Sequence, residues 1–456
     1  MGCKVLPTCV DEVSCFHRFR WVYCQLEALR HCLPPSVGRI LEELPETLDE
    51  TYERVLREIN KANREHARRL LQCLTVALRP LRVEELAEVL AIDFNAPTHG
   101  GIPQLNAKWR WADHHQAVLS TCSSLIAIVD DGDSKVVQFS HFSVKEYLTS
   151  DRLARSSGDV FRYHIVLEPA HTILAQACLG VLLRLDNRVD KYNVRYIPLV
   201  EYAAQYWVDH AQFEKVASRI RDAMEYFFDA DKPHWAAWCR VQMIDKQWLQ
   251  FEPEGSQDAF PLYYASLGGF YDLAEHLVGK HPEHINAMGG EMGTPLVAAL
   301  GGNHFEVAEL LHRNGADVDV RDSYEDTPLC EACRAGVPEV TQWLLKHGAD
   351  VNARGCQTGP PLRLAAYFGR LKDVQMLLEH NADIHIRSNS GQTPLYAAAS
   401  PDPNSRRDQA DIMQVLLDHG AIIDAEDYKG RTPLQIALEK GHDNNATWLK
   451  EHGATR

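Results

Sequence analysis

The chain has 456 residues, too many for a single domain, and its apolar content is sufficient for several cores. A formal net charge of −16 argues against broad binding to nucleic-acid phosphates. No apolar run reaches the roughly 18 residues that would suggest a membrane helix, and the N-terminal sequence lacks the apolar segment of a secretory signal. Twelve irregularly spaced cysteines predict reduced thiols, and therefore a protein of the cytoplasm or nucleus.

The first 60 residues divide into an irregular tail and a helical segment. Residues 1–18 contain three cysteines and no clear periodicity, so we assign them to a tail. Residues 19–60 show helical patterns, the last of which is 48–56. Thr47 stands where it would cap that helix, and the apolar residues after it recur on one helical face.

Residues 61–157 show the element order of a winged-helix domain. Helices are predicted at 64–78, 83–90 and 116–122, followed by two short apolar runs on either side of an Asp- and Gly-containing turn, which is the pattern of a β-hairpin. A last helix follows at 143–148. We expect Arg79, Pro80 and Leu81 only to separate two helices.

A DNA-binding winged helix is kept as a minor alternative. The helix at 83–90 carries Glu84, Glu85 and Glu88, for which the sequence shows no basic partner. Such a helix is poorly suited to face phosphates.

Residues 158–256 are predicted to form a helical linker domain. Their four tryptophans are better explained as core residues than as a ligand-binding box. These are Trp207, Trp235, Trp238 and Trp248.

The last part of the chain, residues 257–456, is repetitive. Thr-Pro-Leu or a variant of it recurs with prolines 33, 33, 33 and 39 residues apart, and a weaker copy lies 34 residues earlier. The six prolines are Pro261, Pro295, Pro328, Pro361, Pro394 and Pro433. A 33-residue period that opens on Thr-Pro-Leu resembles the ankyrin repeat, a β-turn followed by two helices, so we expect six repeats.

The repeat also predicts local structure. Thr before each Pro caps the first helix, Pro fits its first turn, and Gly or Asn between the helices adopts a left-handed conformation. In the last unit the polar residues Asp443 and Asn445 replace apolar ones, which predicts a cap whose face has no further neighbour. In the fifth unit the extra residues at 401–407 predict a longer loop between the two helices.

One position departs from the family pattern. Ankyrin repeats often have His after Thr-Pro-Leu, where it braces the turn. Here that place is held by Tyr263, Val297, Cys330, Arg363, Tyr396 and Gln435, so we expect this brace to be absent.

The chain before the repeats also resembles a known family. The strings at 19–57, 79–86 and 139–148 are similar to those of fungal NACHT-ankyrin proteins, which belong to the STAND class of nucleotide-gated switches. In such switches a His of the winged helix contacts bound ADP, and His141 stands at the matching place. The resemblance implies an ATPase core, a winged-helix clamp and a repeat sensor, and it makes residues 19–60 a helical remnant that follows such a core.

The nucleotide-binding part of that pattern is missing. No Gly-x-x-x-x-Gly-Lys-Ser/Thr occurs in the sequence, so no P-loop can hold phosphates and Mg²⁺, and we expect no affinity for ATP or ADP. His141 would then cap or pack, and would sense nucleotide only if an NTPase core were present. The alternative is that this chain is a truncated fragment of a nucleotide-gated NACHT receptor whose NTPase domain lies upstream.

The sequence therefore predicts a mostly α-helical protein that is not an enzyme and has neither cofactor nor metal site. Cys330 and Cys333 lie on a repeat helix where small apolar residues pack, so packing explains them better than metal binding. The predicted function is a scaffold or sensor of the STAND signalling type that binds an unidentified protein, with no nucleic acid, membrane or small-molecule substrate as partner. Its expected contact surface is the concave face and hairpin tips of the repeats. The candidate binding residues at the tips are Tyr324, Glu325, Gln357, Asn389, Asp427 and Tyr428.

Overall fold

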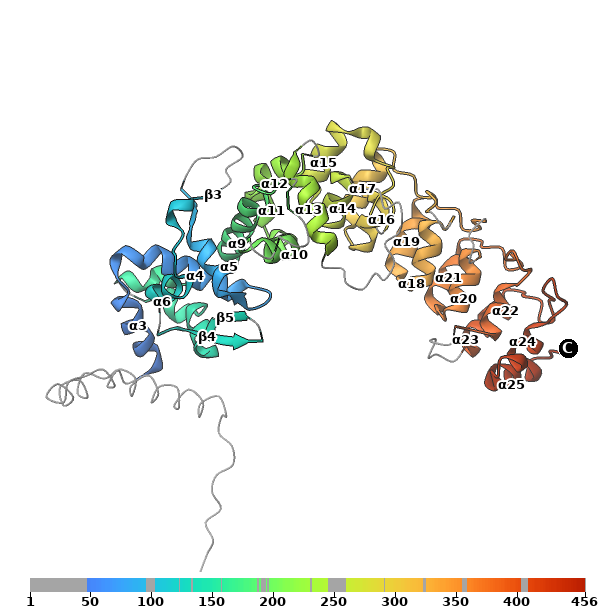
Figure 1. Cartoon of the computed structure of the whole chain (residues 1–456). Coiled ribbons are helices and arrows are strands. Elements are labelled where there is room, and N and C mark those ends of the chain that lie inside the picture. Colours follow the sequence, from blue (N-terminus) through green and yellow to red (C-terminus); the bar gives the residue numbers. More distant parts are fainter. Residues whose placement is uncertain are drawn as a thin grey trace, which may run out of the picture. The chain divides into compact units, whose positions relative to one another are not determined.

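The computed structural model describes residues 47–95, 103–122, 124–132, 134–156, 158–186, 188–189, 194, 197–229, 232–244, 260–290, 292–322, 325–354, 359–402 and 409–455. The chain divides into two compact units at residues 251 and 252 (Figure 1). The predicted tail at 1–18, the start of the next segment up to residue 46, Trp248 and most of the predicted long loop, 403–408, lie outside the described residues.

The first unit begins with the predicted winged helix. Thr47 caps the first described helix, α3, through a reciprocal capping box with Glu50, and the apolar stripe of that helix buries Tyr52 and Leu56. The order of helices and the hairpin agree with the prediction. The elements are α3 (Leu48–Glu58), η2 (Lys61–Asn63), α4 (Arg64–Val76), β1 (Leu81–Arg82), α5 (Val83–Leu90), β2 (Ile92–Asp93), β3 (Gln104–Leu105), η4 (Ala107–Trp109), α6 (His114–Cys122), β4 (Ile126–Asp131), β5 (Ser134–Phe139) and α7 (Phe142–Leu148).

The wing contains one strand more than the sequence predicted. Strands β4 and β5 pair antiparallel from Ile126↔Phe139 to Asp131↔Ser134, and β1 adds to the other edge of β5 through Leu81↔Val137. The prediction that Leu81 only separates two helices was therefore incomplete. A strand of two residues is too short to show a periodic pattern in the sequence. Leu81 is completely buried, and this burial holds it at the edge of β5.

The acidic helix α5 does have basic partners, so that expectation was wrong. The buried Glu85 carboxylate accepts hydrogen bonds from the Arg79 guanidinium at 2.6 and 2.8 Å and from the Arg82 side chain at 2.9 and 3.1 Å. Burial by itself would raise the pKa of Glu85, but these arginines lower it below its usual value. Glu88 pairs with Arg110 in the same way. Arg79 and Arg82 precede the helix and Arg110 lies 22 residues after Glu88, so the residues of α5 by themselves do not show these three partners.

Replacing Glu85 tests how much this cluster stabilises the first unit. Glu85→Ala leaves two arginines facing a buried gap, so we expect the free energy of unfolding to fall by about 3–5 kcal/mol. Glu84→Ala, on the same turn of α5, should change it by about 0.5 kcal/mol or less. Urea unfolding followed by tryptophan fluorescence measures both, and equal effects would show that the cluster contributes nothing specific.

The linker helices pack against the winged helix within this unit. Helix α9 contacts α4 and α10, and Arg82 of the winged helix forms an ion pair with Glu201 of α10 at 2.6 Å. The elements are α8 (Asp151–Ala154), η5 (Gly158–Tyr163), α9 (Leu167–Leu182), α10 (Val200–Ala211), α11 (Val216–Arg219), α12 (Arg221–Phe227) and α13 (Pro233–Ile244).

The tryptophans of the linker form its core, as predicted for those that are described. Trp207 and Trp238 are completely buried, and the Phe227 ring meets both edge-on at centroid distances of 5.5 and 5.4 Å. Trp235 packs on the same cluster at 5.3 Å from Trp238. A ligand-binding box would need open space between these rings, and they fill it with one another.

A buried histidine network crosses from the winged helix to the linker. The Leu78 amide donates to the Tyr202 hydroxyl at 3.2 Å, and that hydroxyl lies 2.8 Å from Nε2 of His210. Nδ1 of His210 lies 2.8 Å from Nδ1 of His171. A neutral His210 satisfies this chain if Tyr202 donates to Nε2 and His210 Nδ1–H donates to His171. Burial is the larger of two causes that lower the pKa of His210 to about 3, and the charge of His171 is the smaller.

This network predicts a loss of stability in mild acid. Below about pH 6.5 the unfolded chain binds a proton at His210 that the folded state does not bind, so stability is lost as pH falls. Between pH 7 and pH 5 this one group should lower the free energy of unfolding by about 2 kcal/mol. His210→Gln should remove that part of the pH dependence, whereas His114→Gln, on α6, should retain it. Urea unfolding at the two pH values measures the free energy of unfolding of the wild type and of both variants. If that free energy changes equally between pH 7 and pH 5 in all three proteins, the prediction is refuted.

The described residues of the second unit include six pairs of α-helices that follow one another along the chain (Figure 1). The four Thr-Pro-Leu threonines cap their helices as predicted: each side chain accepts from the third helical amide at 3.2–3.4 Å. The predicted left-handed turn residues have φ between 59° and 74°. The pairs are α14 (Pro261–Leu267) with α15 (Tyr271–Lys280), α16 (Pro295–Gly301) with α17 (Phe305–Arg313), α18 (Pro328–Ala335) with α19 (Pro338–Lys346), α20 (Pro361–Tyr367) with α21 (Leu371–Glu379), α22 (Pro394–Ala399) with α23 (Ala410–Asp418) and α24 (Pro433–Glu439) with α25 (Asp443–Glu451).

The last pair differs from the predicted cap in one respect. Asn445 does not face solvent: it is buried, and its amide donates to the carbonyls of Ala398 and Ala399 at 3.4 and 3.2 Å. These carbonyls lie at the C-terminal end of α22 in the preceding repeat, where the last C=O groups of a helix lack partners within the helix. The polar residue at this place therefore joins two repeats.

Candidate protein-binding surface of the ankyrin repeats

The turns of the second unit are joined to one another by side chains. Nδ2 of Asn286 donates to the Gly315 carbonyl at 3.1 Å, while its oxygen accepts from the Asp317 amide at 2.9 Å. The side-chain oxygens of Asp319, Asn352 and Asp424 make the same contact as that of Asn286. Each accepts a hydrogen bond from the backbone amide 31 residues further along the chain. At these four places one turn is therefore tied to the next by a bond that requires the stacked arrangement.

The His brace is absent from all six positions after Thr-Pro-Leu, and three of the residues that replace it supply a second set of ties. The Tyr263 hydroxyl accepts from the Met292 amide at 3.2 Å. Nη2 of Arg363 donates to the Gln392 side chain at 3.0 Å, and the Tyr396 hydroxyl donates to Asp427 at 3.1 Å. Longer side chains than His reach the next repeat's turn from the same position, which the sequence pattern alone did not reveal.

Neighbouring residues at the last tip have opposite roles. Asp427, a predicted binding residue, is buried: its carboxylate accepts from Tyr396, from the Lys429 and Arg431 amides and from the Arg431 guanidinium at 2.8 Å. Burial would raise its pKa, but the hydrogen bonds from Arg431 and its neighbours lower it. Asp427 therefore builds the turn and presents no surface to a partner.

Tyr428, by contrast, is 72% exposed, and its amide donates to the Ser390 carbonyl at 3.1 Å. Its ring lies over Gly391, where a Cβ would approach Cδ1 of the tyrosine to 2.6 Å. Gly391 has φ +81°, which also favours glycine. Tyr428 is thus an aromatic side chain on a fixed turn.

The remaining predicted residues divide by location. Glu325 and Asn389 are exposed at their tips, and Glu325 has a left-handed φ of 61°. Tyr324 and Gln357 lie outside the described residues. The structure therefore brings Asn389 and Tyr428 onto adjacent tips and removes Asp427 from the surface.

Two exposed methionines lie at an earlier turn of the repeats, and no sequence pattern singled them out. Met288 and Met292 are 37% and 41% exposed beside the turn before α16. With Val297 and Val320 they line a small hollow of about 30 Å³ that is edged by acidic side chains. Their only sequence signal is two methionines within one turn. We call Met288, Met292, Glu325, Asn389 and Tyr428 together the tip surface.

A larger hollow lies on the second helices. It measures about 520 Å³ and is lined from α15, α17 and α19 by aromatic residues that include Tyr271 and Trp343. The Trp343 ring stacks on His347 at 3.9 Å, and Nε2 of His347 lies 2.9 Å from a Glu309 carboxylate oxygen. We call this the outer-helix hollow.

His141 occupies the cap of α7, as expected in the absence of an NTPase core. Its Nδ1 accepts from the Ser143 amide at 3.2 Å and lies 2.6 Å from the Ser143 hydroxyl. That hydroxyl lies 2.8 Å from the Tyr52 hydroxyl, which links α7 to α3. Capping uses one ring nitrogen and fixes the orientation of the imidazole.

The cysteine pair of the third repeat packs as predicted. Cys330 and Cys333 are both completely buried in α18. Burial raises the pKa of Cys333 well above its usual value, which opposes the thiolate that a metal would need.

Exchanging Asp427 separates its structural role from a binding role. Asp427→Ala should lower the free energy of unfolding by about 2–4 kcal/mol. The reason is that the Arg431 guanidinium loses this carboxylate and two backbone amides of the turn lose their hydrogen-bond acceptor. Lys429→Ala, whose exposed side chain lies on the same turn, should have little effect. Thermal and urea unfolding measure both. If Asp427→Ala unfolds like the wild type, the carboxylate does not hold the turn.

The fold combines a winged-helix domain with ankyrin repeats. Residues 262–355 and 362–455 match the family model of ankyrin repeats. Residues 52–158 match the winged-helix domain of GPI inositol-deacylase. This match begins at Tyr52, within the segment assigned from sequence to a preceding remnant, and the contacts of Tyr52 with Ser143 and Tyr147 show why α3 packs with the domain.

The comparisons with individual proteins cover parts of the chain. Azaphilone pigments biosynthesis cluster protein L of Monascus ruber is 31% identical over 289 residues, which are 59% of this chain and 59% of that protein. The chain thus spans about three fifths of this relative. The crystal structure of an ankyrin repeat domain from Acinetobacter baumannii is 30% identical, covering 43% of this chain and all of that one, with a TM-score of 0.38. Among the described helices, none has the length and apolar character of a membrane span.

Proposed function

We propose that this protein is a scaffold that binds a protein partner through the tip surface of its ankyrin repeats. The observation that carries the proposal is Tyr428, an exposed aromatic side chain on a turn that hydrogen bonds fix to the neighbouring repeat. Tyrosine is enriched among the residues that dominate protein interfaces. A fixed turn also loses little conformational entropy on binding.

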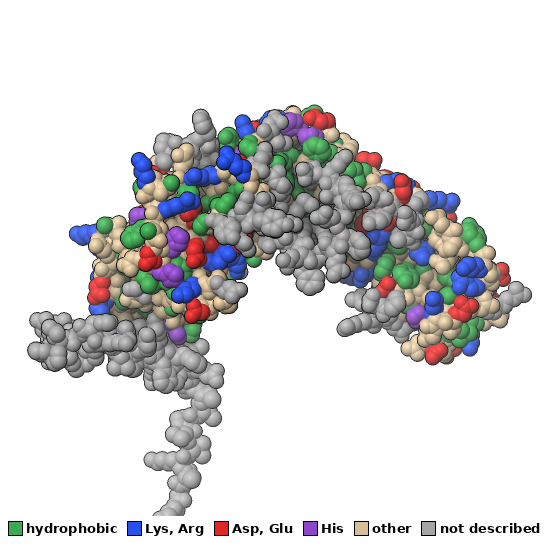
Figure 2. All heavy atoms as spheres, viewed as in Figure 1, with side chains coloured by type: hydrophobic (Ala, Val, Ile, Leu, Met, Phe, Trp, Pro, Cys, Tyr) green, Lys and Arg blue, Asp and Glu red, His purple; other side chains and the backbone are tan. Residues whose placement is uncertain are grey.

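The composition of the tip surface favours a protein over other partners. Met288 and Met292 add adaptable apolar area, which suits a protein surface. Glu325 and the acidic residues beside the methionines add negative charge, in keeping with the net charge of −16. Figure 2 shows acidic and basic side chains interspersed on the face in view. We propose neither nucleic acid nor membrane nor a small-molecule substrate as partner.

The winged helix is proposed not to bind DNA. All of α5 except Glu84 is buried, so this helix cannot enter a groove. Helix α6, which precedes the hairpin, contains neither Lys nor Arg. A phosphate backbone would need such cations.

At a finer level, we propose that the chain acts in signalling as the clamp and sensor part of a STAND-type protein. The NACHT-ankyrin resemblance and the match of the winged helix support this. The competing proposal is a fragment of a longer nucleotide-gated receptor. An in-frame P-loop encoded upstream of Met1 would favour the receptor, and would give His141 a nucleotide to contact.

We further propose that this chain has no catalytic activity and requires no cofactor. The sequence contains no P-loop motif, and carboxylates of the described ankyrin turns such as Asp319 and Asp427 are held in structural bonds. A location in the cytoplasm or nucleus is supported by the six described cysteines, all of which are buried and none of which forms a disulfide within the described residues.

The tip surface is tested by capture of partners with the full chain. Tyr428→Ala, and separately Met288→Ala with Met292→Ala, should weaken capture from an extract of the source organism by about tenfold or more, because they remove exposed anchors. Tyr271→Ala is the matched control, an exposed tyrosine on the outer-helix hollow. Thermal unfolding checks that all variants fold.

The same set of variants shows whether the partner binds the outer-helix hollow instead of the tip surface. Partners that are lost with Tyr271→Ala or Trp343→Ala but retained with Tyr428→Ala would place binding on the outer-helix hollow. That outcome would contradict the tip-surface proposal while leaving a protein-binding function in place.

A further inference from the structure

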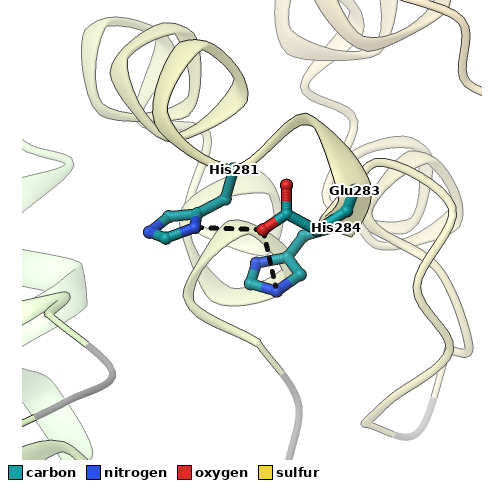
Figure 3. A group of neighbouring side chains, drawn as sticks. All are labelled: His281, Glu283 and His284. Carbon is teal, nitrogen blue, oxygen red and sulfur yellow. Dashed lines mark hydrogen bonds and ion pairs between the residues drawn. The ribbon is translucent and has the colours of Figure 1, made fainter.

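Two histidines and a glutamate gather where the first repeat leaves its second helix. His281 follows α15, and Glu283 and His284 lie in the short 3₁₀ helix η7 (Pro282–His284). Figure 3 shows the three side chains converging, with the Glu283 carboxylate directed toward both imidazoles. Nδ1 of His281 lies 3.2 Å and Nε2 of His284 lies 4.0 Å from the same carboxylate oxygen.

The backbone explains why the two imidazoles share a face. In a 3₁₀ helix, with three residues per turn, side chains at positions i and i+3 eclipse one another. Pro282 fits the first position of this turn, and the His284 amide donates to the His281 carbonyl at 3.0 Å. The two rings accordingly lie 5.1 Å apart and nearly parallel, at 18°.

One of the imidazoles is also held by the fold. The His284 ring stacks on Phe260, at the start of the repeat, with a centroid distance of 4.1 Å and an interplanar angle of 25°. His281 and Glu283 are more exposed, so both can rotate toward His284. The cluster therefore combines one positioned imidazole with two adjustable ligands.

We propose that His281, Glu283 and His284 bind a divalent transition-metal ion, and that the ion is Zn²⁺. Zinc takes imidazole nitrogen and carboxylate oxygen at about 2.0–2.2 Å, which sets neighbouring ligand atoms roughly 3.3 Å apart in a tetrahedral site. One ligand atom from each of the three residues already lies within 4.8 Å of the others. Small side-chain rotations bring these atoms to the required spacing.

The chemistry of the ligand set selects the metal. Two imidazoles with one carboxylate suit zinc and its neighbours, whereas Mg²⁺ and Ca²⁺ prefer oxygen ligands throughout. Three protein ligands leave a fourth position for water or for an atom of a bound molecule. The bound ion would join α15 to the turn after it and so stabilise the first repeat by mass action. This departs from the sequence analysis, which expected no metal site, and it is independent of the proposed tip surface.

Calorimetric titration of the full chain with Zn²⁺ tests the site. We expect one equivalent to bind in wild type and its affinity to fall at least tenfold in His281→Ala and in His281→Ala with His284→Ala. Glu283→Gln should weaken it as well. His281→Ala alone leaves the ring stack between His284 and Phe260 in place, so a loss in that variant does not reflect unfolding.

The matched control removes two histidines elsewhere. His380 and His419 are exposed, and Nδ1 of each lies within hydrogen-bond distance of a carbonyl of its own helix. Replacing both histidines with Ala should leave the binding of one equivalent of Zn²⁺ unchanged. X-ray absorption at the zinc edge should show only nitrogen and oxygen ligands. Unchanged binding in His281→Ala with His284→Ala, equal loss in the control, or zinc–sulfur distances near 2.3 Å would each overturn the proposal.

Discussion

The second unit depends on one constraint: a single pair of short helices cannot bury its own apolar face. First helices of neighbouring repeats therefore pack against one another, as α18 does on α20 and α20 on α22. Leu329, Leu362 and Leu395 are almost completely buried at equivalent places of this stack. Since every repeat contacts its neighbours, order in one turn is transmitted to the next, and the tips become fixed surfaces.

Polar bonds complete what apolar stacking begins. Between the repeats, buried or half-buried polar side chains reach the backbone or side chains of the following turn, as Asn352 does with Asp383 and Tyr396 with Asp427. Such groups are costly to bury unless they are satisfied, so they specify the stacked register as well as stabilising it. The exposed side chain of Tyr428 then stands on a turn whose shape is settled by its buried neighbour Asp427. A rigid support with a protruding aromatic residue is what a binding surface requires.

The first unit uses the same principle over longer distances. Glu85 gathers arginines from the segment before α5, and Arg82 reaches on to Glu201 in α10. The Leu78–Tyr202–His210 network forms a second connection between the same parts. The winged helix and the linker thus share a core and a set of buried polar bonds, which explains why they form one compact unit although their sequence patterns suggest two segments.

The sequence alone determined the local structure: the 33-residue period, the capping threonines, the left-handed turn residues and the β-hairpin all follow from spacing within a few tens of residues. It also determined that Trp207 and Trp238 belong to a core, since large apolar side chains rarely have another place. Tertiary structure decided the rest. The strand at Leu81, the pairing of Glu85 with Arg79, the burial of Asp427 and Asn445 and the eclipsed His281 and His284 depend on geometry that composition does not encode. The physical reason is that helix and turn formation are governed by neighbours along the chain, whereas a charged or polar side chain becomes structural or free according to what packing brings beside it.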